Sequence, residues 1–124
     1  MNHLDIDMAR ISIAEGGLVE VWIRPDVRID VRGLLESMQA RRTLVGDGKG
    51  AIIFLATGDL DWEPAALQTD FFGQDKENIT ALAVAVDSKV LTLVANMYFG
   101  LFPARFPTKV FNSEAEARTW LAGL

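Results

Sequence analysis

An acidic segment, TGDLDWEP, comes nearer to a metal-binding motif than any other part of this sequence. Asp59, Asp61 and Glu63 alternate as at the start of a calcium-binding loop, and Asp70 stands at the twelfth position of such a loop. The loop bends at a glycine in its sixth position. This chain has Pro64 there, and proline is confined to negative φ. We therefore expect no calcium site. We interpret the acids as a turn that favours the positive N-terminal end of the next helix.

No other pattern indicates catalysis or cofactor binding. The GDGKG segment precedes a predicted strand and lacks the Ser or Thr that follows the lysine of a phosphate-binding loop. His3 is the only histidine, it lies in a segment expected to be frayed, and the chain has no cysteine. Five arginines between Arg24 and Arg42 alternate with acids, which indicates a locally paired exposed face or a patch for an acidic partner. The sequence therefore predicts a protein that is not an enzyme and uses no cofactor or metal.

The bulk composition predicts one compact domain over residues 1–124. Half of the residues are apolar and 23% are charged, a balance typical of globular proteins. The net charge of -5 argues against a nucleic-acid partner. The N-terminus MNHLDIDMAR has neither the basic nor the apolar region of a signal peptide, and the absence of cysteine fits a reducing compartment. We therefore expect a cytoplasmic protein.

Hydrophobic periodicity and turn residues predict the strands that position these side chains. Two alternating runs joined by Gly16-Gly17 predict an N-terminal β-hairpin, because glycine supplies the positive φ of a tight turn. The apolar runs AIIFLA and ALAVAV predict central strands covered on both faces. Strands are expected over residues 8–13, 19–23, 51–56, 81–86 and 108–111.

Capping residues indicate where the helices begin. Asp30, either Asp87 or Ser88, and Ser113 each precede a helical pattern, and Ser113 with Glu116 fits a capping box. The first helix is expected to bury the side chains of Val31, Leu34, Leu35 and Met38. Helices are expected from residue 31 to the GDGKG segment, over 63–72, from 88 to about 99, and from 114 to about 122. A hairpin followed by alternating helices and strands predicts a mixed α/β sheet with helices packed on it.

The third of these helices, SKVLTLVANMYF, is apolar around most of its circumference. A surface helix needs an apolar stripe only somewhat wider than about 100°, so the surplus must meet something beyond its own sheet. The domain's own core, a second copy of the chain and an apolar ligand all remain open. A transmembrane span is not expected, because the apolar run is shorter than the roughly 20 residues required. The candidate interface or ligand face consists of Val90, Val94, Met97, Tyr98, Leu101 and Phe102.

The segment AVAVDSKVLTLVANMYFGLFPARFPTKVFNSEAEARTWL resembles the C-terminal half of small bacterial SpoIIAA-like proteins. The likeness lies in a strand, a Ser-led apolar helix with the pair Ala95-Asn96, and a proline-containing turn. A strand ending in Phe111 and a helix closing on Trp120-Leu121 complete it. The rest of the chain resembles the family only in element order. The resemblance implies a mixed α/β fold similar to STAS and Sec14-like domains, with a sheet of four to five strands and helices mainly on one face.

The resemblance also implies a role without catalysis. STAS-fold anti-sigma-factor antagonists switch by phosphorylation of a serine in an Asp-Ser-Ser-Gly turn, and the comparable region here, residues 58–63, has no serine. That switch is therefore carried over to no residue. We expect a STAS-like interaction module that forms a homodimer and contacts a protein partner whose identity is open. The alternative is a module that binds an apolar ligand such as a lipid, by similarity to Sec14-like domains.

Overall fold

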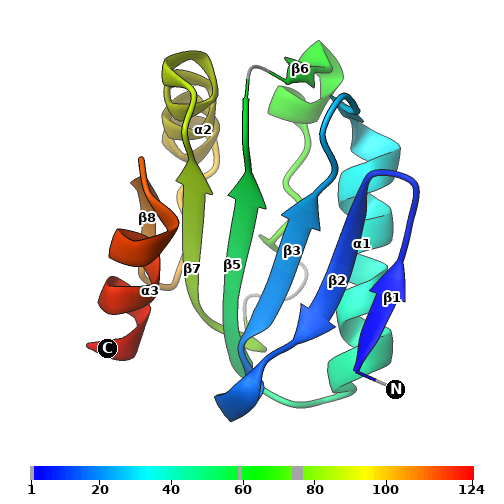
Figure 1. Cartoon of the computed structure of the whole chain (residues 1–124), viewed down its shortest axis with the longest axis vertical. Coiled ribbons are helices and arrows are strands. Elements are labelled where there is room, and N and C mark those ends of the chain that lie inside the picture. The colour runs from blue at the N-terminus through cyan, green and yellow to red at the C-terminus, as the bar shows by residue number, and fades with distance from the viewer. Residues whose placement is uncertain (1, 59, 74–76) are drawn as a thin grey trace.

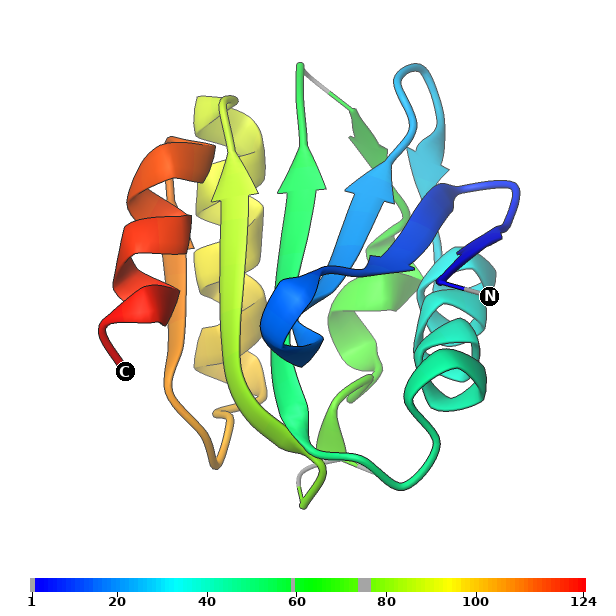
Figure 2. The same cartoon turned by 60° about the horizontal axis from the view of Figure 1, so that its bottom comes forward.

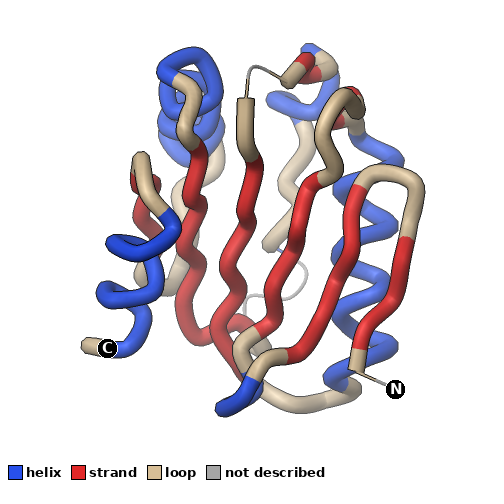
Figure 3. Tube along the Cα trace, viewed as in Figure 1, coloured by secondary structure: helices blue, strands red, loops and turns tan. Residues whose placement is uncertain are grey.

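The computed structural model describes residues 2–58, 60–73 and 77–124. Its main sheet has six strands, and Figures 1 and 3 show them side by side. Across the sheet, the strands are β1 (His3–Asp5), β2 (Ala9–Ile13), β3 (Val19–Ile23), β5 (Gly50–Ala56), β7 (Ile79–Val86) and β8 (Thr108–Phe111). The pairs β1–β2 and β2–β3 are antiparallel, and the other three neighbouring pairs are parallel. The sheet is therefore mixed, as predicted.

Helices cover both faces of this sheet. They are α1 (Val31–Val45), α2 (Lys89–Leu101) and α3 (Glu114–Ala122). α1 and α2 lie on one face and α3 on the other, as Figures 1 and 2 show. On β5, Ile52 and Phe54 belong to the core beneath α1 and α2, whereas Ile53 and Leu55 belong to the core beneath α3. This two-sided burial explains why β5 and β7 have almost no polar residues.

The hairpin and the helix starts follow the predictions. β2 and β3 form the N-terminal hairpin through a short 3₁₀ turn, η1 (Glu15–Gly17), in which Gly16 and Gly17 have φ of 79° and 84°. Each helix begins at a side-chain cap that accepts a backbone N–H. Asp30 accepts the N–H of Gly33 at 2.7 Å. Ser88 accepts the N–H of Leu91 at 3.2 Å, and Ser113 accepts the N–H of Glu116 at 3.1 Å.

The sheet has six strands and not the expected four to five, because the N-terminal segment adds β1 at its edge. The carboxylate of Asp5 accepts hydrogen bonds from Arg10 at 2.8 Å and from Arg24 at 2.8 Å. The Arg10 guanidinium lowers the pKa of the Asp5 carboxyl, and Arg24 acts in the same direction. These ion pairs join the terminal strand to the hairpin, so the segment around His3 is not frayed.

The predicted helix over residues 63–72 is wrong beyond its first turn. The chain forms only a 3₁₀ helix, η2 (Pro64–Gln68). The hydroxyl of Tyr98 donates to the carbonyl oxygen of Thr69 at 2.8 Å and accepts from the N–H of Phe71 at 2.9 Å. A helix through residue 72 would have bonded the Phe71 N–H to the carbonyl oxygen of Leu67. Tyr98 takes this N–H instead, and Phe71 enters the core.

The side of α1 that faces the core also differs from the prediction. Leu34 and Met38 are buried as expected, but Leu35 is 49% exposed. Arg41 is buried, and its guanidinium donates to the carbonyl oxygen of Asn78 at 2.8 Å. The arginine-rich segment is therefore not one exposed face, because one of its members holds the core side of α1 against the start of β7.

Candidate functional site

Helix α2 presents a line of apolar side chains to solvent. Val90, Leu93, Met97 and Leu101, here called the exposed stripe, are 61%, 62%, 50% and 62% exposed. Residues spaced by three and four lie on one face of a helix, so the four side chains form a continuous surface. Half-buried Val94 borders it on the side facing the core. No helix among the described residues is long and apolar enough to cross a membrane, α2 included.

The opposite side of α2 packs into the core. Leu91, Ala95 and Tyr98, here called the buried stripe, are nearly inaccessible, and Tyr98 is 3% exposed. The Tyr98 ring stacks on Phe71 with centroids 6.0 Å apart and meets Phe72 edge-on at 6.3 Å. Burial raises the pKa of Tyr98 to about 12. Tyr98 therefore joins α2 to the segment after η2, together with Phe99, whose ring stacks on Phe72 at 6.2 Å.

The six predicted face residues are divided between these environments. Val90, Met97 and Leu101 belong to the exposed stripe, Val94 and Phe102 are half-buried, and Tyr98 lies in the core. Sequence reasoning left out Leu93, which is as exposed as any of them. Its spacing of three from Val90 and four from Met97 is the signal that would have included it.

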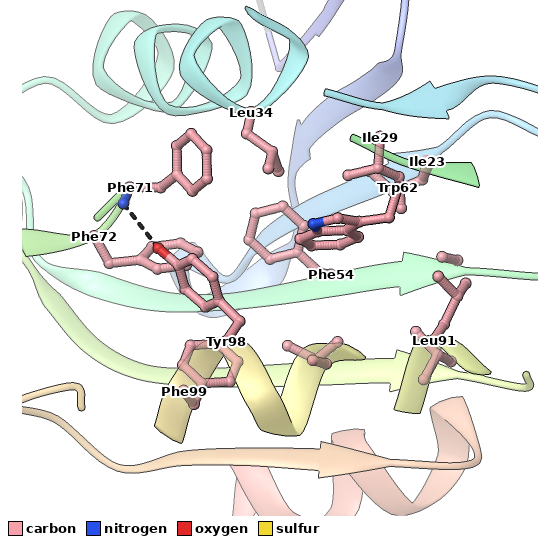
Figure 4. Close-up of a pocket in the computed structure, with 14 residues that line it drawn as sticks. Ile23, Ile29, Leu34, Phe54, Trp62, Phe71, Phe72, Leu91, Tyr98 and Phe99 are labelled. Carbon is pink, nitrogen blue, oxygen red and sulfur yellow. Dashed lines mark hydrogen bonds between the residues drawn. The ribbon is translucent and has the colours of Figure 1, made fainter. Parts of the chain in front are cut away.

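An apolar cavity of about 70 Å³ lies beneath the buried stripe, between the sheet and its two helices. Figure 4 shows its lining, which comes from β3, β5 and β7, from α1 and α2, from β4 (Arg28–Ile29) and β6 (Asp61–Trp62), and from the segment after η2. An apolar cavity of about 150 Å³ is large enough to bind benzene. This cavity is about half as large, so it has room for a small group and not for a lipid chain.

Trp62, one of the lining residues, has a buried indole nitrogen, although the surface of the cavity itself is apolar throughout. A two-stranded parallel pair, β4 (Arg28–Ile29) and β6 (Asp61–Trp62), sets Trp62 beside Ile29, and the Glu63 N–H donates to the Ile29 carbonyl at 2.8 Å. The indole nitrogen of Trp62 is buried and has no hydrogen-bond partner. Figure 4 shows it turned toward Phe54, another lining residue. A buried donor left unpaired costs about 1–3 kcal/mol.

The described part of the acidic segment makes structural contacts. Asp59 lies outside the described residues, and Asp61 is exposed. The sequence predicted that these acids would favour the start of the next helix in the chain. The Glu63 carboxylate instead accepts the N–H of Val31, at the start of α1, at 3.4 Å. Among residues 2–58, 60–73 and 77–124, no three His, Cys, Asp or Glu side chains are grouped to hold a metal ion.

A comparison with known protein families identifies the family of this chain. The model of a domain of unknown function, DUF7793, matches residues 11–124, which run from β2 to the C-terminus. The chain belongs to the DUF7793 family. A comparison of this DUF7793 chain with curated proteins gives no match.

One solved structure shows the fold class of this DUF7793 domain. An uncharacterised protein of the DUF3478 family from Shewanella loihica PV-4, described as having a SpoIIAA-like fold, superposes with a TM-score of 0.60. The two chains are 11% identical, and the match covers 90% of each. A protein of unknown function from Arthrobacter sp. FB24 is 20% identical over 90% of this chain and 97% of its own, with a TM-score of 0.32. The resemblance to SpoIIAA-like proteins is thus confirmed at the level of fold.

Proposed function

We propose that this protein is a non-enzymatic interaction module that pairs with a second copy of itself through the exposed stripe of α2. The observation that supports this proposal is the continuity of the stripe. Single exposed apolar side chains are ordinary on a protein surface, but a contiguous apolar face is typical of an interaction site. Four such side chains follow one another along the helix, each at least half exposed.

Charge and symmetry favour a second copy as the occupant. The chain carries a net charge of -5, which opposes self-association through most of its surface. The exposed stripe contains no charged residue, so two copies meet there without repulsion. A twofold axis places the same patch on itself, and the three- and four-residue spacing gives ridges that fit the grooves of an identical helix.

The size of the helix limits the strength of this dimer. α2 has 13 residues and is therefore about 20 Å long. One helix face of this length buries less than the roughly 800 Å² per partner of a standard stable interface. We therefore expect a reversible dimer whose population rises with protein concentration.

The test is a double substitution in the stripe, Leu93→Glu with Met97→Glu, followed by sedimentation equilibrium over a range of concentrations. The wild type is expected to dimerise reversibly, and the double variant is expected to remain monomeric. Leu35→Glu is the matched control, because Leu35 is an exposed leucine on α1 that lies outside the stripe. A wild type that stays monomeric at several hundred micromolar overturns the proposal, and so does equal dissociation by the control variant.

A second candidate function is the binding of an apolar ligand, which the cavity beneath the buried stripe favours. Its volume of about 70 Å³ restricts the ligand to a small molecule or to one end of a larger one. Dissolved xenon enters apolar cavities and is a neutral probe of this one. Xenon is expected to shift the methyl NMR signals of Ala95 and Leu91, which line the cavity, and unchanged signals would contradict this function.

We also propose that the module works in the cytoplasm without a nucleic-acid partner. The absence of cysteine and the negative net charge support these two statements, respectively. Cell fractionation tests the location. Recovery of the native protein mainly in a membrane or secreted fraction would contradict it.

A further inference from the structure

We infer that a cleft at one end of the sheet is a binding site for an uncharged molecule with a hydroxyl-bearing ring, of the size of a pentose. Four neighbouring parallel strands, β3, β5, β7 and β8, end at this cleft, here called the strand-end cleft. Its volume is about 250 Å³. The inference is independent of the proposed dimer, because no residue of the exposed stripe lines this cleft.

The topology of the sheet creates the strand-end cleft. From β7 the chain continues into α2 on one face of the sheet, and from the neighbouring strand β8 it continues into α3 on the other face. Figure 2 shows both helices beginning at the same end of the sheet. In open α/β sheets, ligands bind outside the carboxyl ends of the strands, where neighbouring connections leave in opposite directions. Residues 85–87 and 112–114 line the cleft, so it lies at such a point.

The lining combines buried apolar side chains with an exposed aromatic ring. Leu55 from β5 and Ala85 from β7 are buried, and both line the cleft. Trp22 from β3 lines it as well and is 38% exposed. A flat indole offers a large apolar surface on which a ring-shaped molecule can stack.

Three polar side chains of the lining have hydrogen-bonding capacity to spare. One carboxylate oxygen of Asp87 accepts the N–H of Gly58 at 2.7 Å, and the other has no partner among the described residues. The Asn112 amide oxygen accepts from the Thr92 hydroxyl at 3.2 Å, which leaves its NH₂ group as a donor. The hydroxyl of Thr57 makes no hydrogen bond within the described part of the chain. Ligand hydroxyls both donate and accept, so they match all three groups.

The charges around the cleft favour an uncharged ligand. The carboxylates of Asp87 and Glu114 line it and would repel an anion. The guanidinium of Arg118 lies over the Trp22 ring, 5.9 Å from its centroid, so a cation bound on that ring would meet like charge. Arg118 pairs with Glu114 at 2.8 Å and with Glu20 at 2.6 Å, and its charge is therefore already compensated.

The volume sets the size of the ligand. An apolar cavity of about 150 Å³ holds benzene, which has six carbon atoms. On the same scale, about 250 Å³ holds roughly ten non-hydrogen atoms, the number in a pentose. The volume is below the roughly 300–1,000 Å³ of pockets for drug-sized ligands, so a larger molecule would enter with one ring only.

The experiment titrates the ¹⁵N-labelled full chain with D-xylose, a pentose, and follows the indole N–H signals of its three tryptophans. D-Xylose is expected to move the signals of Trp22 and of the Asn112 side-chain amide along one binding curve in the millimolar range. The indoles of Trp62 and Trp120 are internal controls, because neither residue lines the cleft. Tetrahydropyran, the xylose ring without its hydroxyls, should bind more weakly, and inorganic phosphate should leave all of these signals in place.

A variant of one polar group tests the role of the lining. Asp87→Asn keeps an oxygen for the Gly58 N–H and removes the carboxylate acceptor, so it should weaken xylose binding by about 2- to 12-fold, as expected for one net hydrogen bond. Asp47→Asn is the matched control, because Asp47 is exposed and precedes β5, at the other end of the sheet. Asn112→Ala removes the amide donor and should weaken binding to a similar extent, which keeps the test valid if Asp87→Asn does not fold.

Three results would overturn the inference. The first is a Trp22 signal that D-xylose leaves in place or moves no more than the signals of Trp62 and Trp120. The second is binding of phosphate or tetrahydropyran at the cleft that is as tight as that of xylose, since it would indicate an anion site or an apolar site. The third is an equal loss of affinity in Asp87→Asn and Asp47→Asn, which would assign the effect to net charge and not to the cleft.

Discussion

Leu91 and Leu93 stand two residues apart on α2 and lie in opposite environments. Leu91 is 3% exposed beside the cavity, and Leu93 is 62% exposed in the middle of the exposed stripe. The two side chains have the same chemistry, so hydrophobicity does not distinguish them. The position of the sheet distinguishes the two leucines, because the sheet covers only the side of α2 that carries the buried stripe. The comparison shows that α2 has more apolar surface than its own domain can use, and this surplus is the basis of the proposed dimer.

The largest expected effect is the difference in stability between two truncations at neighbouring positions, one in the buried stripe and one in the exposed stripe. Tyr98→Ala removes a buried aromatic ring and should lower the free energy of unfolding by about 3–5 kcal/mol. Met97→Ala changes an exposed side chain of similar helix propensity and should stay within about 0.5 kcal/mol. Urea denaturation in a background that carries Leu93→Glu measures both without a contribution from dimerisation. A large loss for Met97→Ala would show that the exposed stripe packs within the domain.

A smaller effect is expected from Tyr98→Phe, which keeps the ring and removes the hydroxyl. The N–H of Phe71 and the carbonyl oxygen of Thr69 would both lose a buried partner. The expected loss is about 1–3 kcal/mol. Hydrogen exchange gives a local measurement, since the Phe71 amide should exchange much faster while amides of β5 change little. Unchanged protection at Phe71 would contradict the role of this hydroxyl in opening the segment after η2.

The Tyr98 hydroxyl also predicts a dependence on alkaline pH. Burial raises its pKa to about 12, whereas an unfolded tyrosine titrates near pH 10. Between these values the folded state keeps a proton that the unfolded state has lost. The contribution of this group is therefore complete below about pH 10 and is lost as pH rises toward about 12. The difference in stability between wild type and Tyr98→Phe should shrink over that interval.

A direct titration checks the same shift. Tyr98 is the only tyrosine in the chain, so tyrosinate absorbance reports this residue alone. The folded protein should titrate near pH 12 and the urea-unfolded protein near pH 10. Coincident titration curves would place the hydroxyl in water and remove the physical basis of the buried stripe.

The sequence predicted features that local chemistry determines. Asp30, Ser88 and Ser113 cap the three helices because a short side-chain oxygen satisfies a free N–H at each helix start. Gly16-Gly17 determines the hairpin for a similarly local reason, its positive φ. The surplus apolar surface of α2 was also visible, because it depends on composition around one helix.

The missed features depend on contacts between distant residues. The helix predicted over residues 63–72 fits local propensity, but the hydroxyl of Tyr98, from α2, takes the Phe71 N–H that this helix would have used. β1 depends on Asp5 meeting Arg24 across the hairpin. The unpaired N–H of Trp62 follows from the pairing of β6 with β4, which no periodicity in a two-residue strand can indicate. Tertiary contacts overrode local preference in each case.

The smallest expected effect tests the exposed stripe at its first residue. Val90 lies in the first turn of α2, which contains Lys89 and no acid. Val90→Glu replaces an exposed apolar side chain by a carboxylate near the positive end of the helix, and glutamate has a higher helix propensity than valine. If Val90 contacts nothing within the domain, the substitution should raise the free energy of unfolding of the monomer by about 0.3–1 kcal/mol. The same change should weaken the dimer, because it places like charges on a surface that pairs with itself.

Val90→Gln is the matched control for this charge. Glutamine has nearly the shape of glutamate without the negative charge, so the difference between the two variants isolates the interaction with the helix dipole. That difference should fade as salt concentration rises, since this interaction is screened. A loss of more than about 1 kcal/mol in both variants would instead mean that Val90 is packed against the domain. Stabilisation of the monomer together with loss of the dimer is the result that only a surface reserved for a partner gives, because a core residue would lose stability in both states.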